Sequence, residues 1–558
     1  MKPFYKGILS NMLFALSAVI LLTPSAHAQL MEKKETFTRA DTLRGMLTPL
    51  RTCYDINYYH LKVKIDIDNK FTSGSNEFNF TADADFKKLQ FDLFSNLKIE
   101  KVVYKGAELP FEKELNAVYV TFPKTIKKGT QDKFEVYYSG NPVIAHHAPW
   151  DGGFLFTKDK SGNPWVSVAC QGFGASSWWP TKDHQSDEPD SVLISISVPK
   201  DLQEVSNGRL RSVVNQPDGY KQYNWFAGNP INNYNVTFYI GKYAHWTDNY
   251  QGENGNLSLD YWALKEDSLA AKTHWDADVK RMLKSFEHWF GPYPFYKDGY
   301  KLVQAPYLGM EHQSAVAYGN QFKQGYLGND LSESGWGLKF DFIVVHESGH
   351  EWFGNNITSK DIADMWIHES FTNYSEALFI ESYYGKQAAT DYVVGIRKKI
   401  QNDIPIIGPY NVNKEGSGDM YYKGANMVHM IRQLINNDEK FRSILRGLNK
   451  TFYHKTVTTA QIENYIAKES GLKLNKVFDQ YLRTIQVPVL SYHIKNDELS
   501  YRWTNTIDGF DMPVKMSLKP GSFDFIKPTQ EWKTIKIKDI DETNFKVDSN
   551  FYVKLKKE

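Results

Sequence analysis

The spacing of hydrophobic residues changes twice along the 558 residues of this chain, and each change predicts a change of secondary structure. From about residue 45 to 245, hydrophobic and polar residues alternate, as at Leu61, Val63 and Ile65. A period of two is typical of half-buried antiparallel strands. The first part of the chain is therefore expected to fold as a β domain.

Helical spacing follows from about residue 268 to 485, for example at Met427, Met430 and Ile431. The pattern Thr458-x-x-Gln461 resembles a capping box at the start of a helix. After residue 488 the alternation returns. We predict a multidomain α+β protein made of a signal peptide, an N-terminal antiparallel β domain, a mainly helical domain and a small C-terminal β domain. The expected boundaries are residues 1–28, 29–252, 253–488 and 489–558.

The N-terminus has the features of a secretory signal. Lys2 and Lys6 precede an apolar run, Met12 to Leu22, which is too short to span a bilayer comfortably. Ala26-His27-Ala28 fits a small-x-small cleavage site. We expect an exported protein, periplasmic or secreted, with no stable membrane span after cleavage; an uncleaved anchor is the alternative.

Charge and cysteine content narrow the choice of partners. The chain has 66 basic and 65 acidic residues. This near-neutral balance gives no electrostatic attraction to nucleic acid or to anionic lipid. Its two cysteines, Cys53 and Cys170, are far apart in sequence, and nothing in the chain indicates that they pair. We expect both to be buried thiols.

The segment His346-Glu347-Ser348-Gly349-His350 predicts a metal site. Residues four apart lie on the same face of a helix, so the two imidazoles are placed to bind one ion, and Glu347 lies beside them. A catalytic zinc site typically has three protein ligands and one open position. The alternative that involves no metal is a solvent-facing His/Glu pair on a helix.

The missing ligand is expected to be a carboxylate or a third histidine. Glu369 follows His350 at a distance that lets one helix end and a second begin. Glu376 lies two turns further along the same helical face. It is placed to accept a hydrogen bond from a liganding histidine and so to fix that ring's tautomer.

These motifs resemble the aminopeptidase N family of zinc metallopeptidases, the gluzincin aminopeptidases. The family pattern is HExxH, 18 residues and then Glu, and the matches extend to the neighbouring residues. The matching segments are His350-Glu351-Trp352-Phe353-Gly354-Asn355, Trp366-Ile367-His368-Glu369-Ser370-Phe371 and Tyr421-Tyr422-Lys423-Gly424. The resemblance implies a saddle-like β domain, a thermolysin-like catalytic domain and a third, β domain.

The resemblance also implies roles for individual residues. It makes His346, His350 and Glu369 the ligands of one zinc ion. It makes Glu347 the general base and Tyr421 a hydrogen-bond donor to the transition state.

A second family element, G-x-M-E-N, corresponds to Leu308-Gly309-Met310-Glu311-His312. By resemblance, Glu311 binds the free amine of the substrate, and Gly309 and Met310 contact the substrate beside it. Leu308 and His312 depart from the pattern, which leaves open how the substrate backbone is held.

Two further segments of the β region match the family. Gln171, nine residues before Pro180, resembles the family's amine-site glutamine. Asp187-Glu188-Pro189 resembles a structural segment at the domain junction.

We expect a zinc-dependent aminopeptidase that hydrolyses N-terminal residues from peptides with a free N-terminus. The alternatives are a zinc endopeptidase and a non-catalytic periplasmic peptide-binding protein. The sequence leaves open the preferred side chain, the oligomeric state and the physiological substrate. Ligand type favours zinc without excluding another divalent ion.

Overall fold

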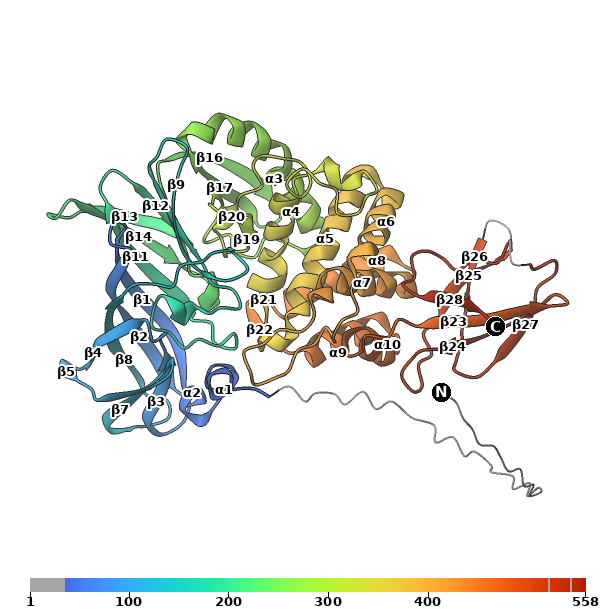
Figure 1. Cartoon of the computed structure of the whole chain (residues 1–558), viewed down its shortest axis with the longest axis horizontal. Helices are drawn as coiled ribbons and strands as arrows, with labels where there is room; N and C mark the ends of the chain where they lie inside the picture. Colours follow the sequence, from blue (N-terminus) through green and yellow to red (C-terminus); the bar gives the residue numbers. More distant parts are fainter. Residues whose placement is uncertain (1–35, 520–521, 542–543) are drawn as a thin grey trace, which may run out of the picture. The chain divides into compact units, whose positions relative to one another are not determined.

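The computed structural model describes residues 36–519, 522–541 and 544–558. The chain divides into two units, residues 1–38 and 39–558, and the second contains every helix and strand described (Figure 1). The predicted signal peptide, residues 1–28, lies outside the described residues. None of the described helices combines the length and the apolar character needed to cross a membrane.

The N-terminal part is rich in β-structure, as the alternation predicts. Two short helices, α1 (Arg39–Gly45) and α2 (Pro49–Thr52), precede the strands. The strands are β1 (Tyr54–Asp66), β2 (Phe71–Ala82), β3 (Phe86–Asp92), β4 (Leu97–Tyr104), β5 (Ala107–Glu108), β6 (Phe111–Glu114), β7 (Ala117–Ile126), β8 (Gln131–Gly140), β9 (Gly153–Lys158), β10 (Pro164–Ala169), β11 (Ser191–Pro199), β12 (Gln203–Ser206), β13 (Arg209–Asn215), β14 (Tyr220–Ala227) and β15 (Phe238–Gly241).

The largest sheet has eight strands in the order β13-β14-β11-β1-β2-β8-β4-β5. Smaller sheets have the orders β12-β15-β10-β9 and β3-β7-β6. One pairing differs from the antiparallel expectation, because β1 and β11 run parallel, with Tyr58 opposite Ser191. The alternation of a strand records which face is buried and not the direction of its neighbour, so the sequence pattern did not reveal this pair.

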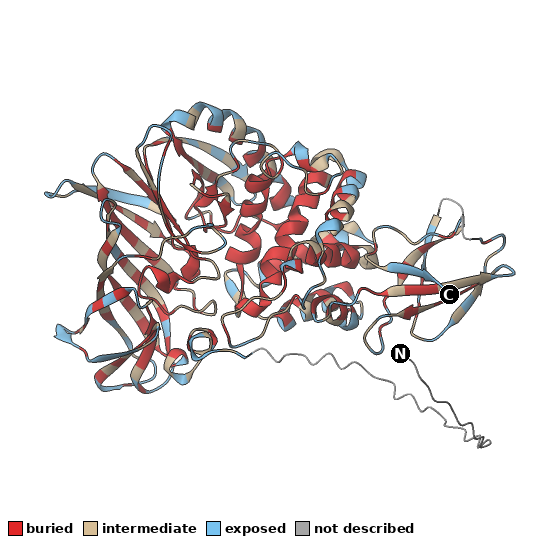
Figure 2. Ribbon diagram, in the orientation of Figure 1, coloured by how far each residue is buried: buried red, intermediate tan, exposed pale blue. Residues whose placement is uncertain are grey.

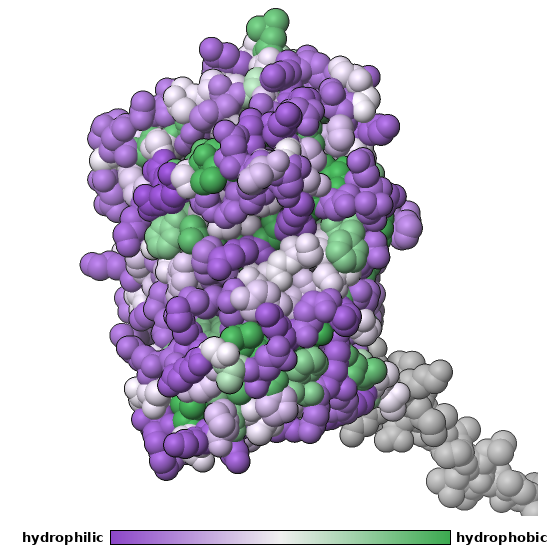
Figure 3. Space-filling model, turned by 90° about the vertical axis from the view of Figure 1, so that its left-hand side faces the viewer, coloured by the Kyte–Doolittle hydropathy of each residue, from purple (hydrophilic) through white to green (hydrophobic). Residues whose placement is uncertain are grey.

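One hydrophobic core joins these sheets. The inward residues of β1 and β11, such as Leu61, Ile65, Ile194 and Ile196, are fully buried. Each such side chain contributes about 1.5–3 kcal/mol of transfer free energy to folding. The outer face of the domain is mostly hydrophilic, with hydrophobic side chains in small scattered groups (Figure 3).

The chain enters a second sheet directly after β15. This sheet has the order β16-β17-β18-β20-β19, and its strands are β16 (Tyr243–Gly252), β17 (Gly255–Leu264), β18 (Tyr300–Gln304), β19 (Gly309–Met310) and β20 (Val316–Tyr318). The expected boundary after residue 252 falls in the turn of the β16–β17 hairpin, whose strands pair from Tyr243 and Leu264 onward. We therefore propose Lys242 as the point where the first domain ends.

Helices dominate the region from residue 268 to 482, as predicted. They are α3 (Ser268–Phe290), α4 (Phe342–Gly349), α5 (Trp366–Tyr384), α6 (Lys386–Gly395), α7 (Tyr422–Ile435), α8 (Asp438–Thr451), α9 (Thr459–Ser470) and α10 (Asn475–Leu482). Thr458 and Gln461 form the predicted capping box at the start of α9. Helix α4 is buried throughout and α5 is buried as far as Ile380, which explains their nearly continuous red in Figure 2.

A small β-structure follows, beginning at Val489. It consists of β23 (Val489–Lys495), β24 (Glu498–Thr504), β25 (Val514–Lys519), β26 (Ser522–Ile526), β27 (Lys533–Lys536) and β28 (Lys554–Lys557). Its buried residues, including Leu490 and Trp503, belong to the same hydrophobic core as the helices. The fold class predicted from the sequence, with β-rich, helical and small β parts in this order, is confirmed.

Polar contacts fasten the N-terminal β domain to the helical part. Asn235 donates from its side-chain amide to Asn355 Oδ1 (2.8 Å), and Asn207 donates to the backbone oxygen of Gln313 (2.7 Å). Near the Asp187-Glu188-Pro189 segment, Ser359 donates to Gln185 across the same junction (3.2 Å).

Cys53 and Cys170 are buried free thiols, as expected.

Candidate metal centre and active-site cavity

Helix α4 carries the two candidate histidine ligands. Asp341 caps its N-terminus, accepting hydrogen bonds from the backbone N–H groups of Ile343 (2.9 Å) and Val344 (3.2 Å). The apolar first turn is buried and anchors the helix. One turn later, His346 and the helix-terminal His350 lie on the same face, with ring centroids 5.0 Å apart.

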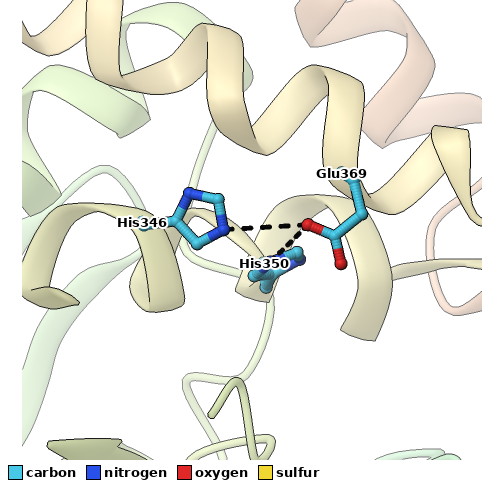
Figure 4. Close-up of side chains that lie close together, drawn as sticks. All are labelled: His346, His350 and Glu369. Atoms are coloured by element: carbon cyan, nitrogen blue, oxygen red, sulfur yellow. Dashed lines mark ion pairs between the residues drawn. The ribbon is translucent and has the colours of Figure 1, made fainter. Parts of the chain in front are cut away.

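Glu369 reaches the two histidines from the first turn of α5 (Figure 4). Its Oε2 lies 3.7 Å from His346 Nε2 and 3.4 Å from His350 Nε2. Ligand atoms about 2.0–2.1 Å from a tetrahedral zinc are about 3.3 Å apart, which is close to the spacing seen here. Glu369 Oε2 is also buried without a hydrogen-bond donor among the described residues. Two imidazoles and one carboxylate therefore fit a zinc ion.

Hydrogen bonds at the far side of each ring turn the Nε2 atoms toward this point. Glu376 accepts from His346 Nδ1 (2.7 Å), which is the contact predicted from its place on α5. The backbone oxygen of Phe353 accepts from His350 Nδ1 (3.0 Å). Gly354 allows this turn of the chain, because its φ is +133° and a Cβ there would lie 3.2 Å from His350 Nδ1.

The site is strongly negative in the absence of a cation. Burial acts to lower the pKa of His346, but the carboxylates of Glu369 and Glu376 on either side of its ring raise it well above 6.5. For His350, burial also acts to lower the pKa, and the charges of Glu369 and Glu311 raise it to about 9. A divalent ion bound between the two rings would be stabilised by the same carboxylates and would replace the protons on the histidines.

Glu347 projects from α4 into the same cavity. Burial raises the pKa of its carboxyl group to about 7, in spite of the two neighbouring histidines. Strand β19 passes close to this carboxylate at Gly309, where an added Cβ would lie 2.7 Å from Glu347 Oε1. Any larger residue at position 309 would therefore displace Glu347.

Tyr421 approaches the site from the start of α7. Its ring stacks on His346, with centroids 6.1 Å apart. Two contacts fix this position: Ser370, next to Glu369, donates to the backbone oxygen of Met420 (2.7 Å), and Gly424 lets α7 pack against Ser370. Burial, followed by the charge of Glu369, raises the pKa of Tyr421 well above 10, so its hydroxyl stays protonated.

Glu311 lies at the end of β19 and meets residues of the N-terminal domain. Gln171 donates to Glu311 Oε1 (2.5 Å), and the Tyr234 hydroxyl donates to the same oxygen (3.0 Å). Asn355 holds the backbone oxygen of Glu311 (2.8 Å). Glu311, Glu347 and His350 have side-chain atoms within 4.8 Å of one another, so this carboxylate lies beside the metal centre.

Comparison with known families identifies the family to which the chain belongs. Residues 275–481 match the peptidase family M1 domain, and residues 55–234 match the peptidase M1 N-terminal domain. The chain belongs to peptidase family M1. The sequence-based resemblance to aminopeptidase N-type metallopeptidases is thus confirmed.

Curated M1 relatives are distant in sequence. Leukotriene A-4 hydrolase of Xenopus laevis is 23% identical over 444 residues, covering 74% of this chain and 68% of that protein. Probable aminopeptidase 2 of Sulfurisphaera tokodaii is 22% identical over 426 residues, covering 72% of this chain and 51% of that protein. The match spans about half the length of the archaeal relatives.

Solved M1 structures share the fold. A substrate-bound mutant of the M1 zinc metallopeptidase from Deinococcus radiodurans has a TM-score of 0.65 at 19% identity, covering 78% of this chain and 96% of that chain. A mutant two-domain M1 zinc metallopeptidase bound to L-tryptophan has a TM-score of 0.67 at 20% identity, with the same coverage. At these identities the likeness shows the fold, and family membership implies a zinc metallopeptidase.

The M1 motifs converge on one cavity of about 420 Å³. Every candidate residue of the sequence analysis except Glu376 lines it, and Glu376 lies behind His346. The lining candidates are Gln171, Gly309, Met310, Glu311, His346, Glu347, His350, Glu369 and Tyr421.

The M1 cavity also contains residues that sequence reasoning missed. Glu415 and Trp150 line it, and Tyr234 binds Glu311 from behind. Glu415 precedes Tyr421 in the same glycine-containing loop. Its place in that loop is the sequence feature that could have indicated a position near the site. Nothing in the local sequence distinguishes Tyr234 or Trp150 from the many other aromatic residues of the strands.

The two departures from the M1 motif have different surroundings. His312 is fully buried, and its Nδ1 lies 2.6 Å from the Tyr239 hydroxyl. Burial lowers the pKa of His312 to about 3, so the ring is neutral. Leu308 instead lines the cavity, and it also lines a neighbouring cavity of about 610 Å³.

Proposed function

We propose that this M1 metallopeptidase is a zinc-dependent aminopeptidase that removes N-terminal residues from peptides. The observation that carries the proposal is the position of Glu311. Its carboxylate is buried next to Glu347 and His350 and is oriented by Gln171 and Tyr234. A carboxylate so close to the candidate metal centre favours substrates with a positive charge near the bond to be cleaved.

In this proposal one zinc ion is held by His346, His350 and Glu369. When bound, zinc lowers the pKa of a water molecule and polarises a carbonyl oxygen, which is the chemistry that hydrolysis of a peptide bond requires. The ligand spacing and the unpartnered Glu369 Oε2 support this ligand set.

Glu347 acts as the general base. It takes a proton from the attacking water and then delivers that proton to the leaving amine. Its burial supports the role, because a carboxyl group with a pKa of about 7 is suited to both steps near neutral pH.

Tyr421 stabilises the negative charge that develops on the carbonyl oxygen. Its hydroxyl remains protonated in the buried, negative surroundings and is therefore available as a donor. The stacking on His346 keeps the ring at the edge of the site.

Glu311 binds the α-ammonium group of the substrate. Burial raises the pKa of Glu311, and a bound ammonium group offsets that penalty by pairing with the carboxylate. An internal peptide bond has no such charge, so the same carboxylate disfavours cleavage within a chain. Gly309 and Met310 line the cavity next to it and are proposed to contact the substrate.

We also propose that the protein is exported, on the basis of the signal-like N-terminal sequence. Its substrates would then be peptides outside the cytoplasm. N-terminal sequencing of the mature protein tests this directly, and Gln29 is the expected first residue.

A panel of aminoacyl-amide substrates tests the enzymatic proposal. Each substrate is assayed with a free and with an acetylated amine, before and after removal of the metal by a chelator. We expect cleavage of the free form to exceed that of the acetylated form by at least about 10- to 100-fold, the value of one charged hydrogen bond. Chelation should abolish activity, and added zinc should restore it. Equal cleavage of both forms would indicate an endopeptidase, and full activity without metal would refute the zinc mechanism.

A further inference from the structure

Glu415 is a carboxylate of the active-site cavity to which the proposed mechanism gives no role. Its loop, residues 413–418, leads into Tyr421 and is held in place at both ends. Asn413 donates to the backbone oxygen of Gly172 (3.0 Å), and Ser417 donates its backbone N–H to the oxygen of Pro405 (2.9 Å). The loop therefore presents Glu415 at a defined position in the cavity wall.

That position is close to the amine-binding group. A Cβ built on Gly172 would lie 3.0 Å from Glu415 Oε1, so the carboxylate rests against the backbone that directly follows Gln171. Gln171 in turn binds Glu311. Glu415 thus lies next to the pair that is proposed to hold the first residue of the substrate.

Glu415 has no partner of its own. Among the residues that the structure describes, none forms a hydrogen bond or an ion pair with its side chain, and no lysine or arginine lines the cavity. Burial, followed by the charges of Glu369 and Glu311, raises the pKa of Glu415 to about 7. This carboxylate is therefore poised for an added cation.

The charged groups that line the cavity also indicate that Glu415 lacks a counterion. Its lining carboxylates are Glu311, Glu347, Glu369 and Glu415, whereas the two histidines are neutral when they bind a metal. The proposed roles assign Glu369 to zinc, Glu311 to the α-ammonium group and Glu347 to proton transfer. Glu415 is therefore the lining carboxylate that has no assigned counterion, and it lies against the backbone that follows Gln171.

We propose that Glu415 selects substrates whose first residue has a cationic side chain, lysine or arginine. The proposal rests on the aminopeptidase function and specifies its substrate class. The aliphatic stem of such a side chain would pack along the aromatic wall formed by Phe342, Tyr421 and Tyr422, and its charged end would pair with Glu415.

The test compares matched substrates on the wild-type enzyme and on Glu415→Gln. Lysyl and norleucyl amides differ only at the end of the side chain, as do arginyl and citrullyl amides. For the wild type we expect kcat/KM to be about 10- to 100-fold higher for the charged member of each pair. Glu415→Gln should reduce each ratio to nearly one and leave the norleucyl and citrullyl amides almost unchanged.

The neutral substrates make the result interpretable. If Glu415→Gln lowers the rates of all four substrates equally, Glu415 acts on the α-ammonium group or on the fold, and the proposal is overturned. A wild-type enzyme that cleaves lysyl and norleucyl amides equally well also overturns it. Failure of the aminopeptidase function would look different, since no free-amine substrate would then be preferred over its acetylated form.

One further measurement on the wild type covers the case of a Glu415→Gln variant that does not fold, and a second variant controls for net charge. The wild-type ratio of lysyl to norleucyl cleavage should fall as ionic strength rises, because salt screens the interaction of the partly exposed Glu415. A ratio above one that is independent of salt contradicts the proposal. Glu531→Gln removes an exposed carboxylate outside the cavity and should leave every ratio unchanged, which controls for net charge.

Discussion

The two halves of the cavity that are proposed to bind the metal and the substrate amine are assembled in different ways. His346, His350 and Glu369 come from two buried helices of one domain and lie close together in the sequence. Gln171 and Glu311 are 140 positions apart, and their contact joins the N-terminal domain to the catalytic sheet. The half proposed to carry out the chemistry is thus built within one domain, whereas the half proposed for recognition depends on how two domains pack.

Because the two halves are built from different parts of the chain, we expect substitutions to affect either the reaction rate or the choice of substrate. Substitutions in the helices should change turnover for every substrate, because they alter the metal or the proton transfer. Substitutions at the domain junction should change which substrates are chosen, because they alter the surroundings of Glu311. Glu347→Gln, Glu376→Gln and Tyr234→Phe test the two sides of this division, and Glu204→Gln tests a buried carboxylate that belongs to neither.

The largest effect is expected from Glu347→Gln in α4. Loss of a general base lowers kcat by about 10²- to 10⁴-fold, and here the loss should be equal for all substrates. Zinc content, measured on the purified variant, should remain at the wild-type level because Glu347 is not a proposed ligand. Unchanged turnover would exclude Glu347 as the base, and loss of zinc would move it into the ligand set.

A smaller effect is expected from Glu376→Gln in α5. The neutral side chain no longer raises the basicity of His346, and such substitutions behind a metal ligand typically weaken metal affinity by about 10- to 100-fold. Competition with a chelator of known affinity measures the change. Glu381→Gln on the same helix is the matched control, since it breaks the ion pair with Arg432 (2.6 Å) away from the site. It should lower thermal stability and leave zinc affinity unaltered; equal zinc loss in both variants would contradict the assignment.

The junction is tested by Tyr234→Phe. This variant removes one hydrogen bond to Glu311 from the N-terminal domain, and we expect about a tenfold decrease in kcat/KM for free-amine substrates. Cleavage of acetylated substrates and zinc content should not change. Tyr223→Phe, which removes a hydroxyl contact to the Leu202 backbone in the same domain, is the control. If Tyr234→Phe lowers both substrate forms alike, the proposed separation of rate and selectivity fails.

The smallest effect, on stability alone, is expected from Glu204→Gln in the N-terminal domain. Glu204 is fully buried, and its one hydrogen bond comes from Trp225 (2.8 Å). Burial raises its pKa well above 4.5, so the folded protein keeps a proton that the unfolded chain releases. The free energy of unfolding should therefore decrease as pH rises above about 4.5, by up to about 1.4 kcal/mol per pH unit from this group.

In the Glu204→Gln variant this part of the pH dependence should disappear. Denaturant unfolding between pH 5 and pH 8 measures the slope, and activity per folded molecule should be that of the wild type. An unchanged slope would show that Glu204 titrates normally in the folded protein.

The sequence predicted the local half of the site well for physical reasons. The i, i+4 spacing of His346 and His350 fixes their shared face, and Glu369 needs only a second helix to reach them. The contact between Glu376 and His346 follows from the same helical geometry. Gln171, by contrast, was suggested only by family resemblance, because no local pattern encodes a contact between distant strands and loops.

Other features lay outside what local patterns encode. Glu415 has an ordinary loop sequence around it. Its lack of counterions is visible only in the folded structure, where the distant segments that line the cavity come together. The polar, glycine-rich turn near residue 252 resembles a linker, although it joins the two strands of the β16–β17 hairpin. The parallel pairing of β1 with β11 was missed because alternation does not report strand direction.

That parallel pairing constrains the order in which the chain acquires its properties. Strand β1 leaves the ribosome early but cannot complete its sheet until β11 has been synthesised, since the two are direct neighbours. Gln171 lies between them in the chain, within the segment that this pairing closes. Because β11 ends at Pro199, well before Phe342, we expect this sheet to close before α4 and α5 leave the ribosome, so the domain that presents Gln171 can fold before the metal ligands have been synthesised.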